Sequence, residues 1–148
     1  MVQVTSKIRA STDDVFAVIA DGWSYAGWVV GASHIRAVDE TWPRVGARIH
    51  HSVGPWPLTI QDTTEVRAVD PPWSIELGAR LWPLGTAVIR LDLRATGPAS
   101  CQVLMSEEAD GGPGRLIPHA AQALLLTPRN KESLARLADL AIGRGRPV

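Results

Sequence analysis

The most constraining feature of the sequence is a long helical segment near its end, because the preceding chain is typical of short strands. From Leu116 to Ile142, apolar side chains recur at helical spacing and most charged side chains fall on the opposite side. The apolar set is Leu116, Ala120, Leu124, Leu134, Leu137, Ala138 and Ala141, and the opposite side carries Arg129, Glu132, Arg136 and Asp139. An apolar helix face needs a partner that covers it. We therefore expect this helix to lie on a sheet, with Pro128 either bending it or dividing it into two helices.

The earlier part of the chain predicts that sheet. A strand over residues 2–8 is followed by two short helical segments, the first beginning after Ser11 and the second at 23–28. Six strand-like runs follow, at about 33–39, 45–53, 58–69, 73–81, 86–95 and 100–108, and the turns between them are rich in proline and glycine. Short links between consecutive strands favour an antiparallel meander. We expect an α+β fold that forms one domain over residues 1–148.

Composition excludes several classes of function. Fifteen basic and fifteen acidic side chains give a formal net charge of zero, which disfavours nucleic acid as a partner. The start of the chain does not resemble a signal peptide, and no apolar run approaches the ~18 residues that span a bilayer. We expect a cytoplasmic protein without stable membrane insertion. Cys101 is the only cysteine, so an internal disulfide and a thiolate-cluster metal site are excluded.

Three local motifs and the order of the elements resemble a known superfamily. The motifs are the run VFAVI at 15–19, the turn VRAVDPP at 66–72 before the strand WSIEL, and the segment RNKESLARL at 129–137. Together they resemble the helix-grip fold of the START-like (SRPBCC) superfamily, most closely its polyketide cyclase/dehydrase and lipid transport branch. The resemblance implies a strongly curved seven-stranded antiparallel sheet gripped by a long C-terminal helix, with an apolar ligand cavity between them.

Strand alternation places a few ionisable side chains on the inward face of the sheet. His51, Asp62 and Glu107 have the inward parity, and His119 lies at the start of the terminal helix. We predict His51, Glu107 and His119 as catalytic residues that transfer protons in a dry pocket, with Glu107 the strongest candidate. The alternative is that each lies near the end of an element and is simply hydrogen-bonded.

No metal and no cofactor is expected. His50 and His51 are neighbours in a strand, so they point to opposite faces and cannot bind one ion together. No pair of histidines has the helical spacing of a zinc site, and neither a nucleophile motif nor a dinucleotide or phosphate loop is present.

Tryptophan is unusually abundant, with six copies against one phenylalanine and one tyrosine. Three of the tryptophans fall in segments that rim the cavity in the fold that the chain resembles, where flat rings stack on a planar ligand or plug the ends of the sheet. The side chains predicted to bind ligand are Trp28, Trp56, Asp62, Leu77, Trp82, Leu91, Met105 and Leu124.

Three functions stay open at this point. The first is binding or transport of a hydrophobic small molecule such as a lipid, an isoprenoid or an aromatic polyketide. The second is a cyclase or dehydratase that uses histidine and glutamate in the cavity. The third is a protein-interaction module. The mostly aliphatic inward faces favour binding. The oligomeric state is left open, a homodimer included.

Overall fold

The computed structural model describes residues 1–53, 60–81 and 85–145, and within them seven strands form one antiparallel sheet. The strands are β1 (Val2–Ile8), β2 (Ala32–Val38), β3 (Arg48–Val53), β4 (Ile60–Asp70), β5 (Ser74–Leu81), β6 (Gly85–Gly97) and β7 (Ser100–Gly111). The helical elements are α1 (Thr12–Ala20), η1 (Gly22–Ser24), α2 (Tyr25–Trp28), η2 (Pro113–Leu116) and α3 (His119–Gly145). The predicted fold class and order of elements are confirmed.

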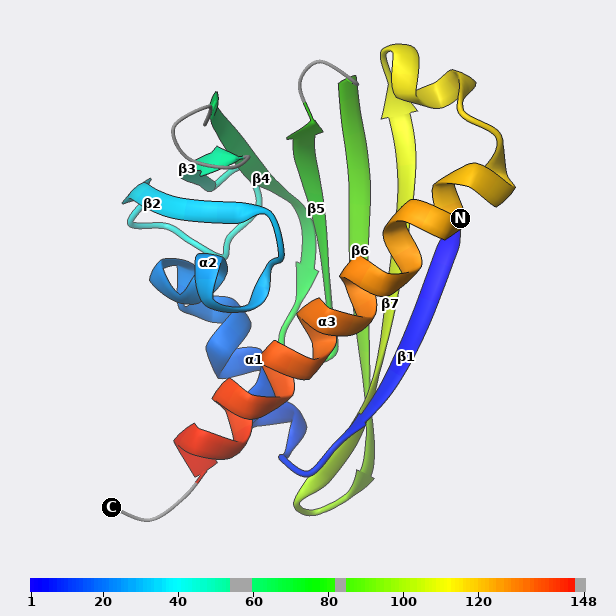
Figure 1. Cartoon of the computed structure of the whole chain (residues 1–148). Helices are drawn as coiled ribbons and strands as arrows, with labels where there is room; N and C mark the ends of the chain where they lie inside the picture. The colour runs from blue at the N-terminus through cyan, green and yellow to red at the C-terminus, as the bar shows by residue number, and fades with distance from the viewer. Residues whose placement is uncertain (54–59, 82–84, 146–148) are drawn as a thin grey trace.

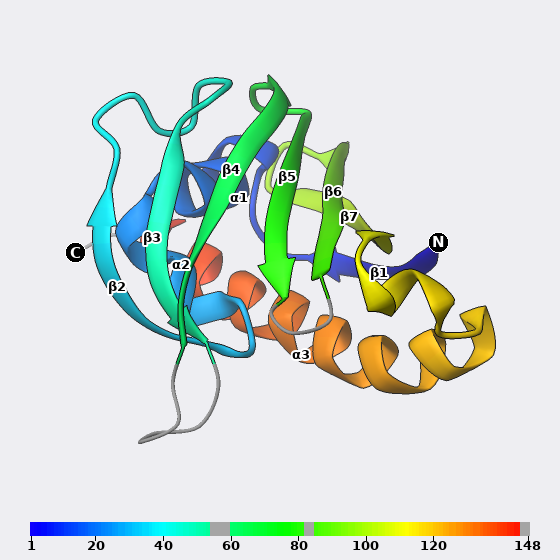
Figure 2. The same ribbon diagram turned by 90° about the horizontal axis from the view of Figure 1, so that it is seen from above.

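The strand order is β1-β7-β6-β5-β4-β3-β2, so the first two strands of the sequence form opposite edges of the sheet. The helices α1 and α2 connect these edges, and α3 crosses the same face of the sheet (Figure 1). Seen from above, the sheet curves over all three helices (Figure 2). Register shifts in the β2–β3 and β4–β5 pairings are the kind of irregularity that bends a strand. The result is a concave face that points towards the helices.

The strand β3 is shorter than its predicted range of 45–53. Residues before Arg48 form a tight turn, in which the amide of Ala47 donates to the carbonyl of Arg44. Gly46 adopts a φ of +90°, a conformation that favours glycine. The apolar side chain of Val45 therefore points away from the core and is exposed.

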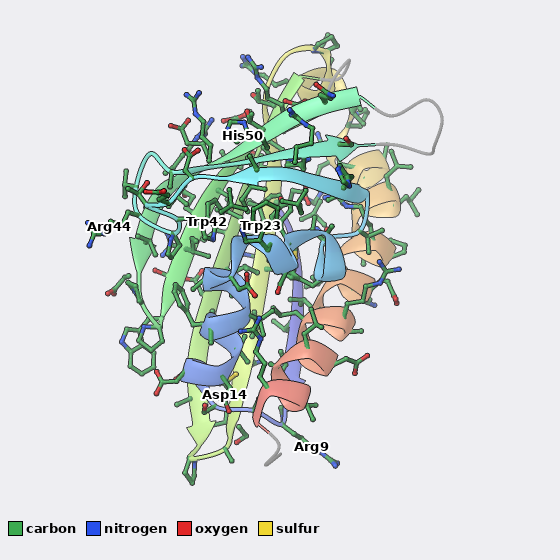
Figure 3. The ribbon with its side chains drawn as sticks, turned by 90° about the vertical axis from the view of Figure 1, so that its left-hand side faces the viewer. Arg9, Asp14, Trp23, Trp42, Arg44 and His50 are labelled. Carbon is green, nitrogen blue, oxygen red and sulfur yellow. The ribbon has the colours of Figure 1, made fainter. Side chains whose placement is uncertain are left out.

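Hydrogen bonds at both ends of α1 fix the position of this helix. Ser11 caps α1, because its Oγ accepts a hydrogen bond of 3.1 Å from the amide of Asp14, as the sequence predicted. At the other end of α1, the buried indole of Trp42 donates to the carbonyl of Ile19 over 3.1 Å. Figure 3 shows Trp42 close to the helical layer. This hydrogen bond anchors the β2–β3 connection to α1.

Alternation along the strands places the expected residues inside. The described inward positions of β5, β6 and β7 are buried, including Leu77, Leu91, Met105 and Glu107. Leu77, Leu91 and Met105 join side chains of α1, α2 and the second half of α3 in one hydrophobic core. Within the described residues, no helix combines the length and the apolar content needed to cross a membrane.

The terminal helix is one continuous helix around Pro128, and only its second half matches the predicted apolar face. Leu134, Leu137 and Ala141 are buried, whereas Leu124 is 79% exposed. At 3.6 residues per turn, Leu124 is rotated by about 80° from Leu134, so the two cannot share a narrow face. Leu116 is 86% exposed and precedes α3. The prediction that one apolar face runs from Leu116 to Ala141 is therefore wrong in its first half.

Replacing one leucine in each half of α3 with alanine should show that the two halves of the helix are packed differently. Leu137→Ala should lower the free energy of unfolding by about 2–5 kcal/mol, because it leaves a cavity in the core. Leu124→Ala, on the exposed side of the same helix, should change it by less than about 0.5 kcal/mol. Urea denaturation measures both, and equal effects would contradict the described packing of α3.

Candidate functional site

Glu107 lies at the centre of a buried ionic cluster that joins the sheet to the terminal helix. Its side chain is fully buried on β7, and Nη2 of Arg129 donates to both carboxylate oxygens, at 2.5 and 2.7 Å. Nδ2 of Asn130 donates to Oε1 at 3.0 Å. The carboxylate is therefore paired and hydrogen-bonded on both oxygens, as a buried charge requires.

The sequence interpretation placed Arg129 on the outer side of the helix, and this was wrong. At helical spacing its backbone is about 140° from that of Leu134, but the side chain of arginine is long enough to reach back around the helix. The side chain is 25% exposed, and its guanidinium meets Glu107 beneath α3. A face assignment from Cβ direction alone misses such a contact.

A second group of polar side chains forms a hydrogen-bonded chain between α2 and the sheet. Nε2 of His51 lies 2.8 Å from Oγ1 of Thr64, and the hydroxyl of Tyr25 lies 3.2 Å from the same oxygen. The rings of Tyr25 and His51 stack, with centroids 5.5 Å apart. Strands β3 and β4 pair next to each other, and α2 brings Tyr25 over them. Thr64 thus connects the phenol to the imidazole.

Burial sets the protonation of both rings. Burial lowers the pKa of His51, against a smaller opposing effect of the Asp62 carboxylate and the backbone of Ser52. Burial also raises the pKa of Tyr25, while the hydrogen bond from Thr64 and the charge of Arg129 act the other way. Near neutral pH the imidazole is therefore uncharged and the phenol keeps its proton.

These groups border one small cavity, which has a volume of about 40 Å³. Its polar lining includes Tyr25, His51, Thr64 and Arg129, and Val29 and Ile89 are among its apolar lining residues. Nδ1 of His51 is buried and makes no hydrogen bond within the described part of the chain. Because buried polar atoms are normally hydrogen-bonded, this nitrogen is a position where a bound molecule can find a partner. We call this space the His51 cavity.

A second cavity, of about 70 Å³, lies beneath the first half of α3. Ala87 and Ala109 line it from the sheet, Ile117, Leu125 and Leu126 line it from the helical side, and Glu107 borders it. We call it the α3 cavity. Glu107 and His51 therefore border different cavities, and Arg129 connects them by pairing with Glu107 and bordering the His51 cavity.

The other predicted catalytic residue lies elsewhere. His119 is exposed at the start of α3, and its Nε2 lies 3.1 Å from the carbonyl oxygen of Met1. It borders neither of these two cavities. His50 is on the outer face of β3, 3.3 Å from Asp39 (Figure 3). Among the described residues no group of histidine, cysteine, aspartate and glutamate could hold a metal ion.

Of the eight predicted ligand-binding residues, four are part of the hydrophobic core. Trp28 is 2% exposed and packs edge-on against Tyr25, so it does not lie at a cavity rim. Leu77, Leu91 and Met105 are packed in the core and line neither cavity. Asp62 is buried near His51, where its charge affects the imidazole. Leu124 projects outward, and Trp56 and Trp82 lie outside the described residues.

Sequence reasoning did not select Tyr25, Thr64, Arg129 or Asn130 as site residues. Two signals concerned three of these residues: Tyr25 is the only tyrosine in the chain, and Arg129 and Asn130 begin the motif at 129–137 that carried the family resemblance. Neither signal indicates proximity to His51 or Glu107, because the contacts join segments that are far apart in the sequence.

The ion pair gives a first prediction on stability. Arg129→Met should lower the free energy of unfolding by about 3 kcal/mol, because it leaves a buried carboxylate with Asn130 as its main partner. The double variant Glu107→Leu/Arg129→Met removes both charges and should regain most of that loss. Urea denaturation provides the measurement. Arg136→Met, which breaks an exposed pair with Glu132, should cost at most about 0.5 kcal/mol, and a comparable loss at Arg129 would contradict the described burial.

The lowered pKa of His51 gives a prediction on pH. The unfolded chain takes up a proton on this histidine at higher pH than the folded protein does, so His51 destabilises the fold as pH falls below about 6.5. His51→Gln should therefore weaken the loss of stability between about pH 7 and pH 5. Denaturation curves of both proteins across that range measure it, and an identical pH profile would contradict burial of the imidazole.

Comparisons with known proteins agree with this architecture. Residues 1–141 match the family described as polyketide cyclase / dehydrase and lipid transport. The comparison with curated protein sequences found no match.

Solved structures with similar folds include proteins from several sources. The Zhui aromatase/cyclase from Streptomyces sp. R1128 is 18% identical with a TM-score of 0.71, and the match covers 98% of this chain and 94% of that one. A conserved protein from Geobacillus kaustophilus is 11% identical with a TM-score of 0.72, over 95% of this chain and 94% of that one. The di-domain aromatase/cyclase StfQ of the steffimycin pathway is 14% identical with a TM-score of 0.67, over 95% of this chain and 44% of that one. At these identities the likeness shows the helix-grip fold alone. With the match over residues 1–141, the chain belongs to the polyketide cyclase/dehydrase and lipid transport family.

Proposed function

We propose that the protein is a cofactor-independent enzyme of the cyclase/dehydratase type, which binds a hydrophobic ketone and moves a proton at the carbon next to the carbonyl. The observation that carries this proposal is the convergence of a neutral imidazole, two hydroxyls and the side chains of two arginines, Arg80 and Arg129, on the His51 cavity. Family membership supports a hydrophobic ligand-binding or cyclase role. The sequence alone did not offer a convergent acid–base set, and this cluster supplies one.

His51 is the proposed base, and the hydrogen-bonded chain explains how it is prepared. If Nε2–H donates to Thr64, and the Thr64 hydroxyl donates to Tyr25, two groups are left over for a ligand. One is the lone pair on Nδ1 of His51, which has no partner within the described residues. The other is the phenolic proton of Tyr25. A single tautomer thus supplies a base and a donor in one cavity.

The proposed step removes a proton from the carbon next to the ketone. The C–H bond breaks, its proton moves to Nδ1 of His51, and its electron pair forms a C=C bond while negative charge moves to the ketone oxygen. Tyr25 and Arg129 border the same cavity and can donate hydrogen bonds to that oxygen. The enolate then follows one of two routes. It attacks a second carbonyl of the same ligand and closes a ring by a new C–C bond, and the oxygen of that carbonyl takes the proton from His51. Alternatively it expels a β-hydroxyl, which leaves as water with the proton from His51.

Binding without turnover is the second candidate function. It is favoured by Glu107, whose two carboxylate oxygens are occupied by Arg129 and Asn130, so that it does not serve as a free acid or base. In this case the cavities hold an apolar molecule and the polar chain only recognises its head group. Such a carrier would use the same pocket, and the experiment below distinguishes the two functions.

Deuterium exchange tests the proposal directly. In D₂O, the protein should catalyse exchange of the methyl protons of 2-acetylnaphthalene and of acetone, which proton NMR follows. His51→Gln should lower the exchange rate by about 100-fold or more while the dissociation constant of 2-acetylnaphthalene changes by less than about threefold. His50→Gln changes the neighbouring histidine on the outer face and should leave exchange unchanged.

Two outcomes count against the enzyme. Exchange that survives His51→Gln would remove the imidazole from the mechanism. Binding of 2-acetylnaphthalene without any exchange would favour the carrier instead.

A further inference from the structure

Two arginines at one end of the His51 cavity have most of their hydrogen-bond donors free within the described residues. Arg80 lines the cavity with a side chain that is 69% exposed, and its Nε lies 4.0 Å from Oδ1 of Asp62, which is too far for a hydrogen bond. Arg36, on β2, donates one long hydrogen bond of 3.4 Å to the backbone carbonyl of Asp62. Because both arginines contact Asp62, their guanidinium groups lie at the same end of the cavity.

The charges at this end do not balance. Arg129 also borders the cavity, but its charge is compensated by Glu107. Among the described residues, Asp62 supplies the one carboxylate that Arg80 contacts, and Arg36 contacts no carboxylate. The imidazole in the cavity is uncharged near neutral pH and changes nothing in this balance. Two guanidinium groups therefore share one carboxylate, which leaves an excess of positive charge.

The guanidinium of Arg36 is also close enough to act on the proposed base. Burial is the main cause of the lowered pKa of His51, and the positive charge of Arg36 contributes in the same direction. An anion bound beside Arg36 would oppose this contribution. A negatively charged ligand would therefore make the imidazole a stronger base at the moment when the ligand is bound.

The size of the cavity brings a ligand to these arginines. A space of about 40 Å³ holds a ketone group and a few neighbouring atoms, so a larger ligand extends beyond it. Gly31 and Arg80 are exposed lining residues and mark where the cavity opens to solvent. The unpartnered Nδ1 of His51 is buried. A ligand that contacts both His51 and Arg80 therefore has one end inside the protein and the other at the surface.

We propose that Arg80, assisted by Arg36, forms a carboxylate-binding subsite, so that the substrate of the proposed reaction is a keto acid. The ketone end of this inference rests on the proposed function, and the carboxylate end does not. A planar guanidinium can donate two parallel hydrogen bonds to a carboxylate. Arg80 turns from Asp62 to the ligand, while Asp62 keeps its 2.8 Å hydrogen bond from the amide of Thr63.

Charge selects a carboxylate over a phosphate monoester. A carboxylate carries one negative charge and matches the excess at this end, whereas a phosphate monoester carries about −1.5 to −2. Arg80 is a binding residue in this proposal and takes no part in the proton transfer.

Octanoate and octanamide test the subsite without any turnover, because they share a chain length and differ in charge. Isothermal titration calorimetry should show that the wild-type protein binds octanoate about tenfold or more tightly than octanamide. Arg80→Met should weaken octanoate about tenfold and leave octanamide within about twofold, and Arg80→Lys should retain part of the preference. Arg94→Met changes an exposed arginine that donates to Gln102 and lies outside this cavity, so it should alter neither affinity.

Two ketones of the same chain length connect the subsite to the proposed reaction. Deuterium exchange of the terminal methyl group should have a kcat/KM about tenfold or more higher for 7-oxooctanoate than for 7-oxooctanamide. Arg80→Met should abolish this difference and leave kcat within about threefold, as expected of a residue that only binds. If octanoate binds through Arg80 but no ketone exchanges, the subsite is supported and the proposed function fails.

Three outcomes would overturn the subsite. The first is octanoate binding that Arg80→Met leaves unchanged. The second is an equal loss of octanoate and octanamide in that variant, because it would indicate packing rather than charge recognition. The third is octyl phosphate that binds more than about tenfold tighter than octanoate, because the subsite would then select a phosphate.

Discussion

The arrangement of this molecule depends on a carboxylate that has no contact with solvent. Glu107 is held within the core by Arg129 and Asn130, so the sheet and the terminal helix meet at a charge rather than only at apolar side chains. Replacing a buried ion pair with apolar residues of similar volume is often neutral or stabilising, so stability alone does not account for this one. What the pair does provide is a specific position for α3, because helix and sheet must align their polar groups. It also brings a guanidinium to the edge of the His51 cavity.

The fold was largely predictable because it follows from short-range patterns. Alternation assigned the inward parity of β5, β6 and β7 correctly, and the Ser11 cap and the short turns located the elements. The prediction failed where one helical repeat of apolar residues was extended over too long a segment. The face containing Leu134 and Leu137 does not continue to Leu124, because rotation accumulates along a helix. At β3, the predicted strand began too early, because a hydrogen bond from the amide of Ala47 to the carbonyl of Arg44 closes a turn before Arg48.

The site was predictable only in part, for a different physical reason. The inward parity of His51 and Glu107 could be deduced from their own strands. Their partners come from other elements, and sequence spacing carries no information about contacts such as Tyr25 with Thr64 or Glu107 with Arg129. For Trp28 the sequence left two roles open, stacking on a ligand at a cavity rim or plugging the end of the sheet, and the side chain fills the core beside Tyr25. The polar groups of the candidate site are therefore brought together by contacts between different strands and helices.

The strand order also affects how the site can form. Val4 pairs with Met105, about a hundred positions away in the sequence, whereas Glu107 and Arg129 are 22 positions apart. Contacts of large sequence separation cost much loop entropy before they stabilise anything, and folding slows as their share grows. The pairing of β1 with β7 is therefore expected to form late, and the hairpins between β4 and β7 are the pairings that can form early. The pairing of β3 with β4 brings His51 and Thr64 together, and Tyr25 and Arg129 reach them only where the helical layer packs on the sheet.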